Sequence, residues 1–383
     1  MGFIDAFKGV FLHLSDNDKY VLEQIKDLED YKEIDRLVRQ RKASFVIKKF
    51  NLSMIQDDEY FELESQEQDL ENFLLKVNEQ IKKKCEEKLF TKFANRAYEV
   101  IPNCISPNLY GLDTVKQAIL LQLFSTDNLH ILLLGDSGLG KKELVRAGAE
   151  LSPVSSFGLG SGTQKAGLSV VLSGKEVFKG LLPLADQGVC GIAELNLMRR
   201  EDRAALYNAM EKGFISIDST DGPLKFDARV KVLASANPAG GKFDRTLEKI
   251  KRQLPFDNAL LQRFHLLFFI KSPDAITRSR IAKKTVTDKK LKLKKEDTDF
   301  IKDYIDSTKQ IEVNLPKEFE DEITEFVSYL KGKEYKYLVE ISPRLVIGLI
   351  RLAKASARCE LRTQVEEIDL NRAKEILKES FRV

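Results

Sequence analysis

The chain has 383 residues, of which 43% are apolar and 32% are charged, and its formal net charge is only +3. This composition is typical of a soluble globular protein with two or three domains, and so small a net charge neither requires nor excludes a nucleic-acid partner. The longest apolar runs, HILLLG and LLFFI, are far shorter than the roughly 20 residues of a membrane-spanning helix, so we expect no membrane partner.

Cysteine and histidine are sparse and scattered. The four cysteines contain no C-x-x-C pair, so neither a zinc finger nor another protein-bound metal is predicted. The first residues, MGFIDAFKGVF, lack the basic flank and the cleavage site of a signal peptide. Free thiols without an export signal are typical of a reducing compartment, and we expect a cytoplasmic or nucleoid-associated protein.

The first hundred residues are rich in charge. Residues 1–65 combine a helical pattern with the strand-like stretch SFVIKKFNLSMIQDDEYFEL, and they are expected to form a small domain. Residues 66–105 place apolar side chains at helical spacing and predict a linker helix. The segment PNCISPN breaks that pattern and indicates a domain boundary.

Residues 106–270 alternate buried-strand and helix patterns. The strand candidates are HILLLG, GVCGIAEL, VKVLASAN and HLLFFI, and helical patterns such as RREDRAALYNAMEKG separate them. This alternation predicts an α/β core, a parallel sheet with helices on both faces. Residues 271–383 carry amphipathic helical patterns without a strand run, and they predict a helical domain. Its opening basic stretch, RSRIAKKTVTDKKLKLKKED, is either a solvated face or a nucleic-acid contact.

A glycine-rich turn follows the first strand candidate. The stretch GDSGLGKK matches the phosphate-loop pattern at its first glycine, second conserved glycine and lysine, but Lys142 replaces the expected Ser or Thr. In such a loop the backbone N–H groups and the helix N-terminus cradle phosphates. We therefore expect ATP as a possible cofactor, held by eight residues: Gly135, Asp136, Ser137, Gly138, Leu139, Gly140, Lys141 and Lys142.

Polar residues also stand at the ends of later strand candidates. Glu194 follows the second candidate, where a Walker-B strand ends in Asp-Glu, but the residue before it is Ala193. Asn237 follows the third candidate and is suited to orienting a water beside a γ-phosphate. Arg263 precedes the last one. The spacing favours a phosphoryl-transfer site.

The order of these blocks resembles the minichromosome maintenance (MCM) group of AAA+ ATPases, the ring-shaped replicative DNA helicases. The blocks are GDSGLGKK, LADQGVCGIAELNLMRREDRAALYNAMEKGFISI, ARVKVLASANPAGGKFD and LLQRFHLLFF. SPNLYGLDTVKQAILLQLF is similar to the opening of their ATPase domain, GSGTQKAGLS to the stretch before their helix-2 insert, and SPRLVIGLIRLAKASARCEL to their sensor-2 helix. The resemblance spans roughly residues 101–383 and implies an AAA+ P-loop NTPase core, a helical lid and a reduced N-terminal domain.

The resemblance also implies roles for single residues. Lys141 stands at the Walker-A lysine, Glu194 at the catalytic glutamate and Asn237 at the sensor-1 position. Arg263 matches the arginine finger and Arg344 the sensor-2 arginine. In this family both arginines act on ATP bound by the neighbouring subunit, so the resemblance implies a possible ring with MCM-type partner subunits.

Two departures from the family pattern remove metal ligands. Lys142 replaces the hydroxyl that coordinates Mg²⁺, and Ala193 replaces the aspartate that completes the metal site. We therefore predict that Mg²⁺ binding is weak or absent. The ammonium of Lys142 could neutralise phosphate, pair with Glu194, or simply be solvated. Because a metal supplies several kcal/mol of charge stabilisation, its loss should slow hydrolysis by orders of magnitude.

A further departure concerns DNA. ISIDSTDGPLKF resembles the pre-sensor-1 hairpin, whose tip carries a DNA-gripping lysine in the family. Here Asp218 and Asp221 lie around the tip, and Lys225 lies past the turn. Acidic groups repel phosphates, so we expect DNA binding that is weak and sensitive to salt.

The leading hypothesis is an MCM-like AAA+ protein with impaired or lost ATP hydrolysis and an accessory or regulatory role in DNA replication. The retained arginines would then serve an active partner, or be remnants. The alternative is an active ATP-dependent DNA helicase whose metal is held by phosphates and water alone. A MoxR-like chaperone branch that acts on proteins fits the motifs less closely.

Overall fold

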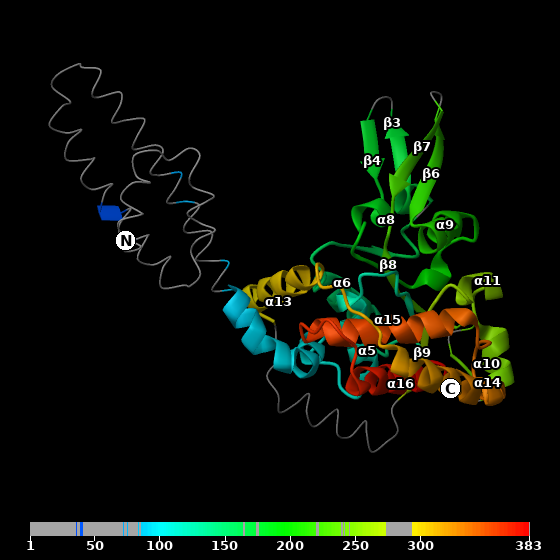
Figure 1. The fold of residues 1–383 in the computed structure, drawn as a ribbon. Coiled ribbons are helices and arrows are strands. Elements are labelled where there is room, and N and C mark those ends of the chain that lie inside the picture. Colours follow the sequence, from blue (N-terminus) through cyan, green and yellow to red (C-terminus); the bar gives the residue numbers. More distant parts are fainter. Residues whose placement is uncertain are drawn as a thin grey trace. The chain divides into compact units, whose positions relative to one another are not determined.

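A computed structural model describes residues 86–382 except 164, 174–175, 220–221, 239, 241, 245 and 273–292, together with positions 36, 39, 40, 72, 75 and 83 (Figure 1). The chain divides into two compact units, residues 1–93 and 94–383. The described positions of the first unit are helical. Nearly all of the expected 1–65 domain, much of the 66–105 linker and most of the basic stretch that opens the helical domain lie outside the described residues.

The second unit is built on a five-stranded parallel sheet. Its strand order is β2 (Ser155–Leu159), β5 (Val189–Ala193), β8 (Lys231–Ala236), β1 (Ile131–Gly135) and β9 (Leu266–Ile270). Strands β1, β5 and β8 are buried along their whole length, which explains why they read as continuous apolar runs. The predicted parallel core is confirmed, and β2 is a strand that the sequence patterns did not predict.

Helices connect and flank the strands. They are α5 (Asp113–Phe124), α6 (Lys141–Glu150), α7 (Lys165–Leu168), α8 (Leu181–Leu184), α9 (Ala204–Lys212), α10 (Leu247–Gln253) and α11 (Asn258–Leu261), with the 3₁₀ turns η1 (Leu195–Leu197) and η2 (Glu201–Arg203). Helix α6 packs against β5 and β8. The predicted helix over RREDRAALYNAMEKG is therefore η2 followed by α9, which ends at Gly213 in the left-handed conformation.

Two β-hairpins project from the core on the same side (Figure 1). One pairs β3 (Val170–Ser173) with β4 (Glu176–Lys179), and the other pairs β6 (Phe214–Ser219) with β7 (Gly222–Asp227). The second hairpin is the one that resembles the family's pre-sensor-1 hairpin, and residues 220–221 at its tip lie outside the described part of the chain. Lys225 lies back from the tip, with its Nζ 4.0 Å from the centre of the Phe214 ring.

The lid is helical, as predicted. It contains α13 (Lys295–Thr308), η3 (Lys317–Phe319), α14 (Glu320–Gly332), η4 (Glu334–Lys336), α15 (Pro343–Cys359) and α16 (Glu367–Ser380). Helix α15 packs against both α5 and α16, and α16 also packs against β9 and α5, so two lid helices fasten the lid to the core. Among the residues that the structure describes, no helix is long and apolar enough to cross a bilayer.

A buried ion-pair network holds α15 to α16. Asp369 is fully buried, and its two carboxylate oxygens accept hydrogen bonds of 2.5 and 2.8 Å from Arg362. Glu360, at the end of α15, pairs with Arg362 at 2.7 Å and with Arg372 at 2.9 Å. The Arg372 guanidinium also lies 3.8 Å from the centre of the Tyr98 ring. Bidentate pairing of this kind fixes geometry as well as charge, so it orients the lid helices.

Candidate functional site

The phosphate loop joins β1 to α6. Gly140 has φ 78° and ψ 4°, the left-handed conformation that glycine adopts without a steric penalty, and α6 begins at the next residue. A Cβ at Gly140 would also collide with the side chain of Leu109, which comes from the segment before α5. The glycine is therefore required both by the turn and by the close packing of that segment on the loop.

Lys141 is held by its own loop. Its Nζ donates hydrogen bonds of 2.7 Å to Gly135 O and 2.6 Å to Asp136 O, and the residue is only 5% exposed. Burial lowers the pKa of Lys141 to about 8, although the carboxylates of Asp136 and Glu194 partly oppose that shift. Its present partners are neutral carbonyls, so an anionic phosphate that reached Nζ would be a stronger partner.

The rest of the loop is open to solvent. Ser137 and Gly138 are exposed, whereas Asp136 is tied down because its Oδ1 accepts a 2.8 Å hydrogen bond from Phe243 N, beyond β8. Lys142 is exposed in the first turn of α6, and within the described residues it makes no ion pair with Glu194. The structure thus gathers the eight predicted loop residues around one turn.

The carboxyl ends of β5 and β8 bring two more predicted residues to this edge. Glu194 directly follows β5 in a left-handed conformation (φ 57°, ψ 44°), and its N–H donates to Ser235 Oγ at 3.2 Å. Asn237 follows β8, which is the neighbour of β1, and its N–H donates to Asn196 Oδ1 at 3.0 Å. A left-handed conformation is uncommon outside glycine and recurs at functional sites. Lys141, Glu194 and Asn237 therefore share one edge of the sheet.

The positions that hold a metal in the family offer no oxygen. Ala193 is the last residue of β5 and is fully buried, and Lys142 carries an ammonium group. The described residues contain no cluster of three or more histidine, cysteine, aspartate or glutamate side chains that could hold a metal ion. The acidic groups that act on Lys141 are the carboxylates of Asp136 and Glu194, whose charges raise its pKa.

The two predicted arginines lie elsewhere. Arg263 precedes β9, at the amino edge of the parallel sheet, whereas the phosphate loop follows the carboxyl end of β1. Arg263 pairs with Glu211 Oε2 at 2.6 Å and lies 4.8 Å from the centre of the Tyr207 ring. Arg344, at the start of α15, donates to Gln262 O at 3.1 Å. The arginines are neighbours of each other and are not brought to the phosphate loop of the same chain.

Glu211 is the residue that holds this second cluster together. The hydrogen bond and the charge of Arg263 lower the pKa of Glu211, and Arg344 adds to the effect. Arg263 still keeps a buried Nε that has no hydrogen-bond partner among the described residues. The cluster therefore has one carboxylate for two guanidinium groups, which leaves it with unmet positive charge.

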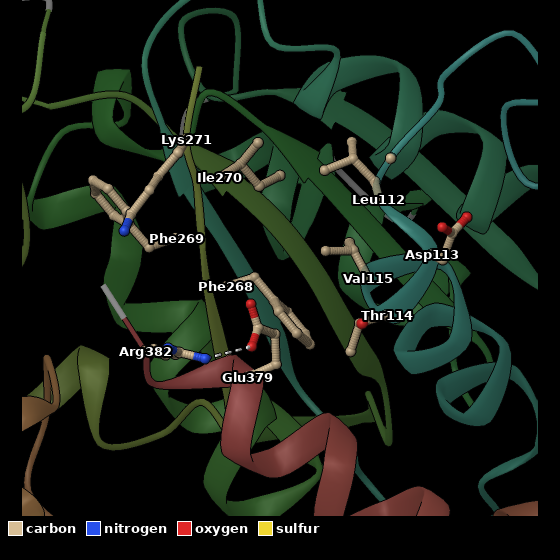
Figure 2. A pocket seen from close by; sticks show the side chains of 11 residues that line it. Leu112, Asp113, Thr114, Val115, Phe268, Phe269, Ile270, Lys271, Glu379 and Arg382 are labelled. Carbon is tan, nitrogen blue, oxygen red and sulfur yellow. Dashed lines mark ion pairs between the residues drawn. The ribbon is translucent and has the colours of Figure 1, made fainter. Parts of the chain in front are cut away.

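A cavity of about 420 Å³ adjoins the loop (Figure 2). It is lined by the start of α5 (Gly111 to Val115), the end of β9 (Phe268 to Lys271), and Glu379 and Arg382 from the chain's last helical turn and its end. Gly135 pairs with Ile270, which places the cavity beside the phosphate loop. Sequence patterns missed these residues because they come from three segments far apart in the chain.

Comparisons with known proteins agree with this geometry. The MCM P-loop domain matches residues 86–289, and the MCM AAA-lid domain matches residues 299–381. DNA replication licensing factor MCM4 of Arabidopsis thaliana is 30% identical over 345 residues, covering 81% of this chain and 40% of that protein. DNA replication licensing factor mcm7 of Xenopus tropicalis is 31% identical over 302 residues, covering 72% and 42%.

Drosophila melanogaster Mcm2, another DNA replication licensing factor, is 28% identical over 324 residues, covering 75% of this chain and 36% of its own length. The chain thus spans about two fifths of the length of these relatives. The matched domains account for both the α/β core with its phosphate loop and the helical lid. The chain belongs to the minichromosome maintenance (MCM) family.

Proposed function

We propose that this chain is an MCM-type subunit that binds ATP at residues 135–142, hydrolyses it slowly or not at all, and acts as an accessory or regulatory component in DNA replication. One observation carries the proposal. The phosphate loop keeps its glycines and Lys141, which is buried on neutral carbonyls, while the two positions that hold a metal in the family are Lys142 and Ala193.

The residues fit a nucleotide. The exposed backbone of Ser137 and Gly138 and the N-terminus of α6 can cradle phosphates, with Lys141 reaching them. The adjoining cavity offers room for a base between the start of α5 and the end of β9. Leu109, packed against Gly140, links the phosphate end of the site to the segment that lines the cavity.

The residues do not fit a magnesium ion held by the protein. When bound, the ion neutralises the charge that develops on the transferred phosphoryl group. Neither Lys142 nor Ala193 can hold it, so we infer that the chain relies on Lys141, with Lys142 nearby in the first turn of α6, for charge neutralisation. We infer that Glu194 and Asn237, which follow the carboxyl ends of β5 and β8, would orient a water, but without the metal they would act on a poorly activated phosphate.

The arginine cluster supports a role in a mixed ring. Arg263 and Arg344 lie side by side at the amino edge of the sheet, where they would face a neighbouring subunit's nucleotide rather than their own. To contact a partner's nucleotide, Arg263 must break its ion pair with Glu211 and form one with a phosphate instead. Acidic residues around the predicted tip of the β6–β7 hairpin favour weak, salt-sensitive DNA contact.

The test is calorimetric titration of ATP into the chain with magnesium and with EDTA. The proposal predicts that the ATP affinities with magnesium and with EDTA agree within about threefold, because neither Lys142 nor Ala193 offers a side-chain oxygen to the metal. At a metal-dependent site the two affinities would differ by about tenfold or more. Steady-state hydrolysis in magnesium should fall far below the ~1 s⁻¹ at the low end of typical enzymes. Turnover at or above that rate would instead support the alternative, an active ATP-dependent helicase.

Restoring the missing oxygens provides the matched variant. Lys142→Ser combined with Ala193→Asp should make ATP binding depend on magnesium and raise hydrolysis on the order of a hundredfold, since a metal supplies several kcal/mol of transition-state stabilisation. Each single substitution restores only half of the site and should gain much less. Because Ala193 is fully buried, circular dichroism must first show that the double variant folds.

A further inference from the structure

An aromatic and basic surface covers one end of the lid. We call it the tyrosine–lysine surface, and it comprises Tyr329, Lys331, Lys333, Tyr335, Lys336 and Lys378. Tyr335 is 72% exposed and Tyr329 is 51% exposed, which is unusual for side chains of this size within a packed helical domain. The surface is formed by the end of α14, the turn η4 and the last turn of α16.

Each exposed tyrosine has a lysine over its ring. The Nζ of Lys333 lies 4.0 Å from the centre of the Tyr329 ring and donates to the Tyr329 hydroxyl at 2.5 Å. The Nζ of Lys336 lies 5.4 Å from the centre of the Tyr335 ring. The contacts hold the rings and the ammonium groups beside one another at the surface.

The surface is electrostatically positive. The hydrogen bond from Lys333 lowers the pKa of Tyr329, and the charges of Lys378 and Lys336 act in the same direction. Glu334 is the acidic residue within η4, and it is already engaged by Lys331 at 2.8 Å and by the N–H of Ile341. Its carboxylate therefore offsets one lysine and leaves the others available to an anion.

Basic residues of the core helix α10 add to the positive charge of the tyrosine–lysine surface. Lys251, near the end of α10, lowers the pKa of Glu334, and Figure 1 draws α10 next to α14, the helix that η4 follows. Lys251 and its neighbour Arg252 are both exposed. A basic track therefore runs from α10 across η4 to the end of α16, with two exposed aromatic rings along it.

We propose that the tyrosine–lysine surface binds single-stranded nucleic acid, with backbone phosphates on the lysines and bases stacked on Tyr329 and Tyr335. Stacking on exposed aromatic rings beside cations is how proteins hold single strands without reading sequence. The inference rests on the proposed function for its class of partner, but it needs neither the phosphate loop nor the hairpins. It gives the lid a binding role of its own.

The exposed side chains favour this partner over other anionic ones. A duplex keeps its base faces stacked internally, so the tyrosines would find nothing to stack on. A membrane-bound helix would carry an apolar face of Trp, Phe or Leu beside its lysines, and the six residues that make up this surface include none of these.

The experiment is fluorescence anisotropy of a labelled oligothymidine titrated with the full chain over a range of salt. The double variant Tyr329→Ala, Tyr335→Ala should weaken binding by about tenfold or more, the loss expected when stacking is removed. Tyr335→Phe keeps the ring and should bind like the parent. Lys336→Gln should bind more weakly and flatten the salt dependence, because one phosphate contact is gone.

A comparison variant, Phe178→Ala, removes an equally exposed aromatic ring from β4 of the projecting hairpin. If oligothymidine binding is unchanged in the tyrosine variant, or falls only with Phe178→Ala, the lid proposal is wrong while DNA binding by the chain stands. If the parent chain does not bind oligothymidine at all, both fail. Tyrosine-dependent binding to anionic vesicles but not to oligothymidine would assign the surface to a membrane and overturn the proposal.

Discussion

The buried lysines of the core and the half-buried cations that join the lid helices are held in different ways. In the core, buried lysines donate to backbone carbonyls: Lys116 to Ser106 and Leu109, Lys141 to Gly135 and Asp136, and Lys231 to Leu123 and Ser125. For all three, burial lowers the pKa. A carbonyl satisfies the hydrogen bond but brings no opposite charge, so each ammonium remains under-compensated.

The cations between the lid helices use carboxylates instead, whereas Arg358, the buried arginine of α15, donates to the carbonyls of Ile311 and Phe124. Arg362 and Arg372 share Glu360, and both reach the fully buried Asp369. Lys374 likewise pairs with Glu322 across two helices. These cations are matched charge for charge, so they fasten helices and have little left for a ligand. The contrast indicates that a carbonyl-held cation, such as Lys141, is the kind that a phosphate can recruit.

The largest effect is expected where the lid's charges are matched most tightly. Asp369→Ala should lower the free energy of unfolding by about 3–5 kcal/mol, because it removes the fully buried carboxylate that accepts two hydrogen bonds from Arg362, whose side chain is only 22% exposed. Urea unfolding measures the change. The control is Glu366→Gln, whose side chain is 61% exposed and pairs with the same arginine at 3.3 Å. An exposed pair should contribute no more than about 1 kcal/mol. Equal losses in both variants would contradict the contrast between matched and exposed charges.

The sequence predicted those parts of the fold that repeat a strong local pattern. Four of the five sheet strands were predicted because buried apolar side chains dominate them: Ile, Leu and Phe in β1 and β9, and Val, Ile, Leu, Ala and Cys in β5 and β8. Strand β2 escaped because Ser155, Ser156 and Gly158 interrupt its apolar character at the edge of the sheet. The β3–β4 hairpin also gave no strand pattern, since β4 is exposed along its length and needs no apolar alternation.

In the candidate site, too, some residues were predicted from sequence motifs and others were not. Motif spacing placed Lys141, Glu194 and Asn237, each of which directly follows a glycine turn or a strand. Their supporting contacts were not visible in the sequence. Asn196, which accepts from the backbone of Asn237, and Glu211, which holds Arg263, lie 41 and 52 residues away from their partners along the chain. Only the folded chain brings these pairs together.

The pH dependence of stability tests whether Lys231, one of the carbonyl-held core lysines, is under-compensated. Burial lowers its pKa to about 7, and the charges of Lys309 and Arg358 act in the same direction. The unfolded chain keeps an ordinary lysine near 10.4. Below about pH 7 Lys231 is charged in both states, so the full cost of burying its charge lowers stability. Between pH 7 and about pH 10 only the unfolded state keeps the proton, so this cost is relieved as pH rises. Stability should rise with pH by up to about 1.4 kcal/mol per unit in this window.

Lys231→Met removes that slope. Relative to the parent, the variant should have its largest advantage at pH 6 and should lose it steadily between about pH 7 and pH 10, as measured by urea unfolding at several pH values. Lys212→Met, at the exposed end of α9, is the matched control and should follow the parent curve. If parent and Lys231→Met curves run parallel, the ammonium of Lys231 is better compensated than its carbonyl partners suggest.

The smallest effect concerns Lys141 and its ligand. With a pKa of about 8, Lys141 is charged at neutral pH and loses its proton within reach of an ordinary titration. A nucleotide binds the charged form, so affinity should be flat below pH 8 and fall by up to about tenfold per pH unit above it. A lysine of ordinary pKa would keep full affinity to about pH 10. Calorimetric titration of ATP between pH 7 and 9.5 gives the profile, and Lys141→Met should bind weakly with no such bend. A parent profile that stays level to pH 9.5 would mean that Lys141 already carries a stable charge, and the carbonyl-held cation would then be no different from the arginines of the lid.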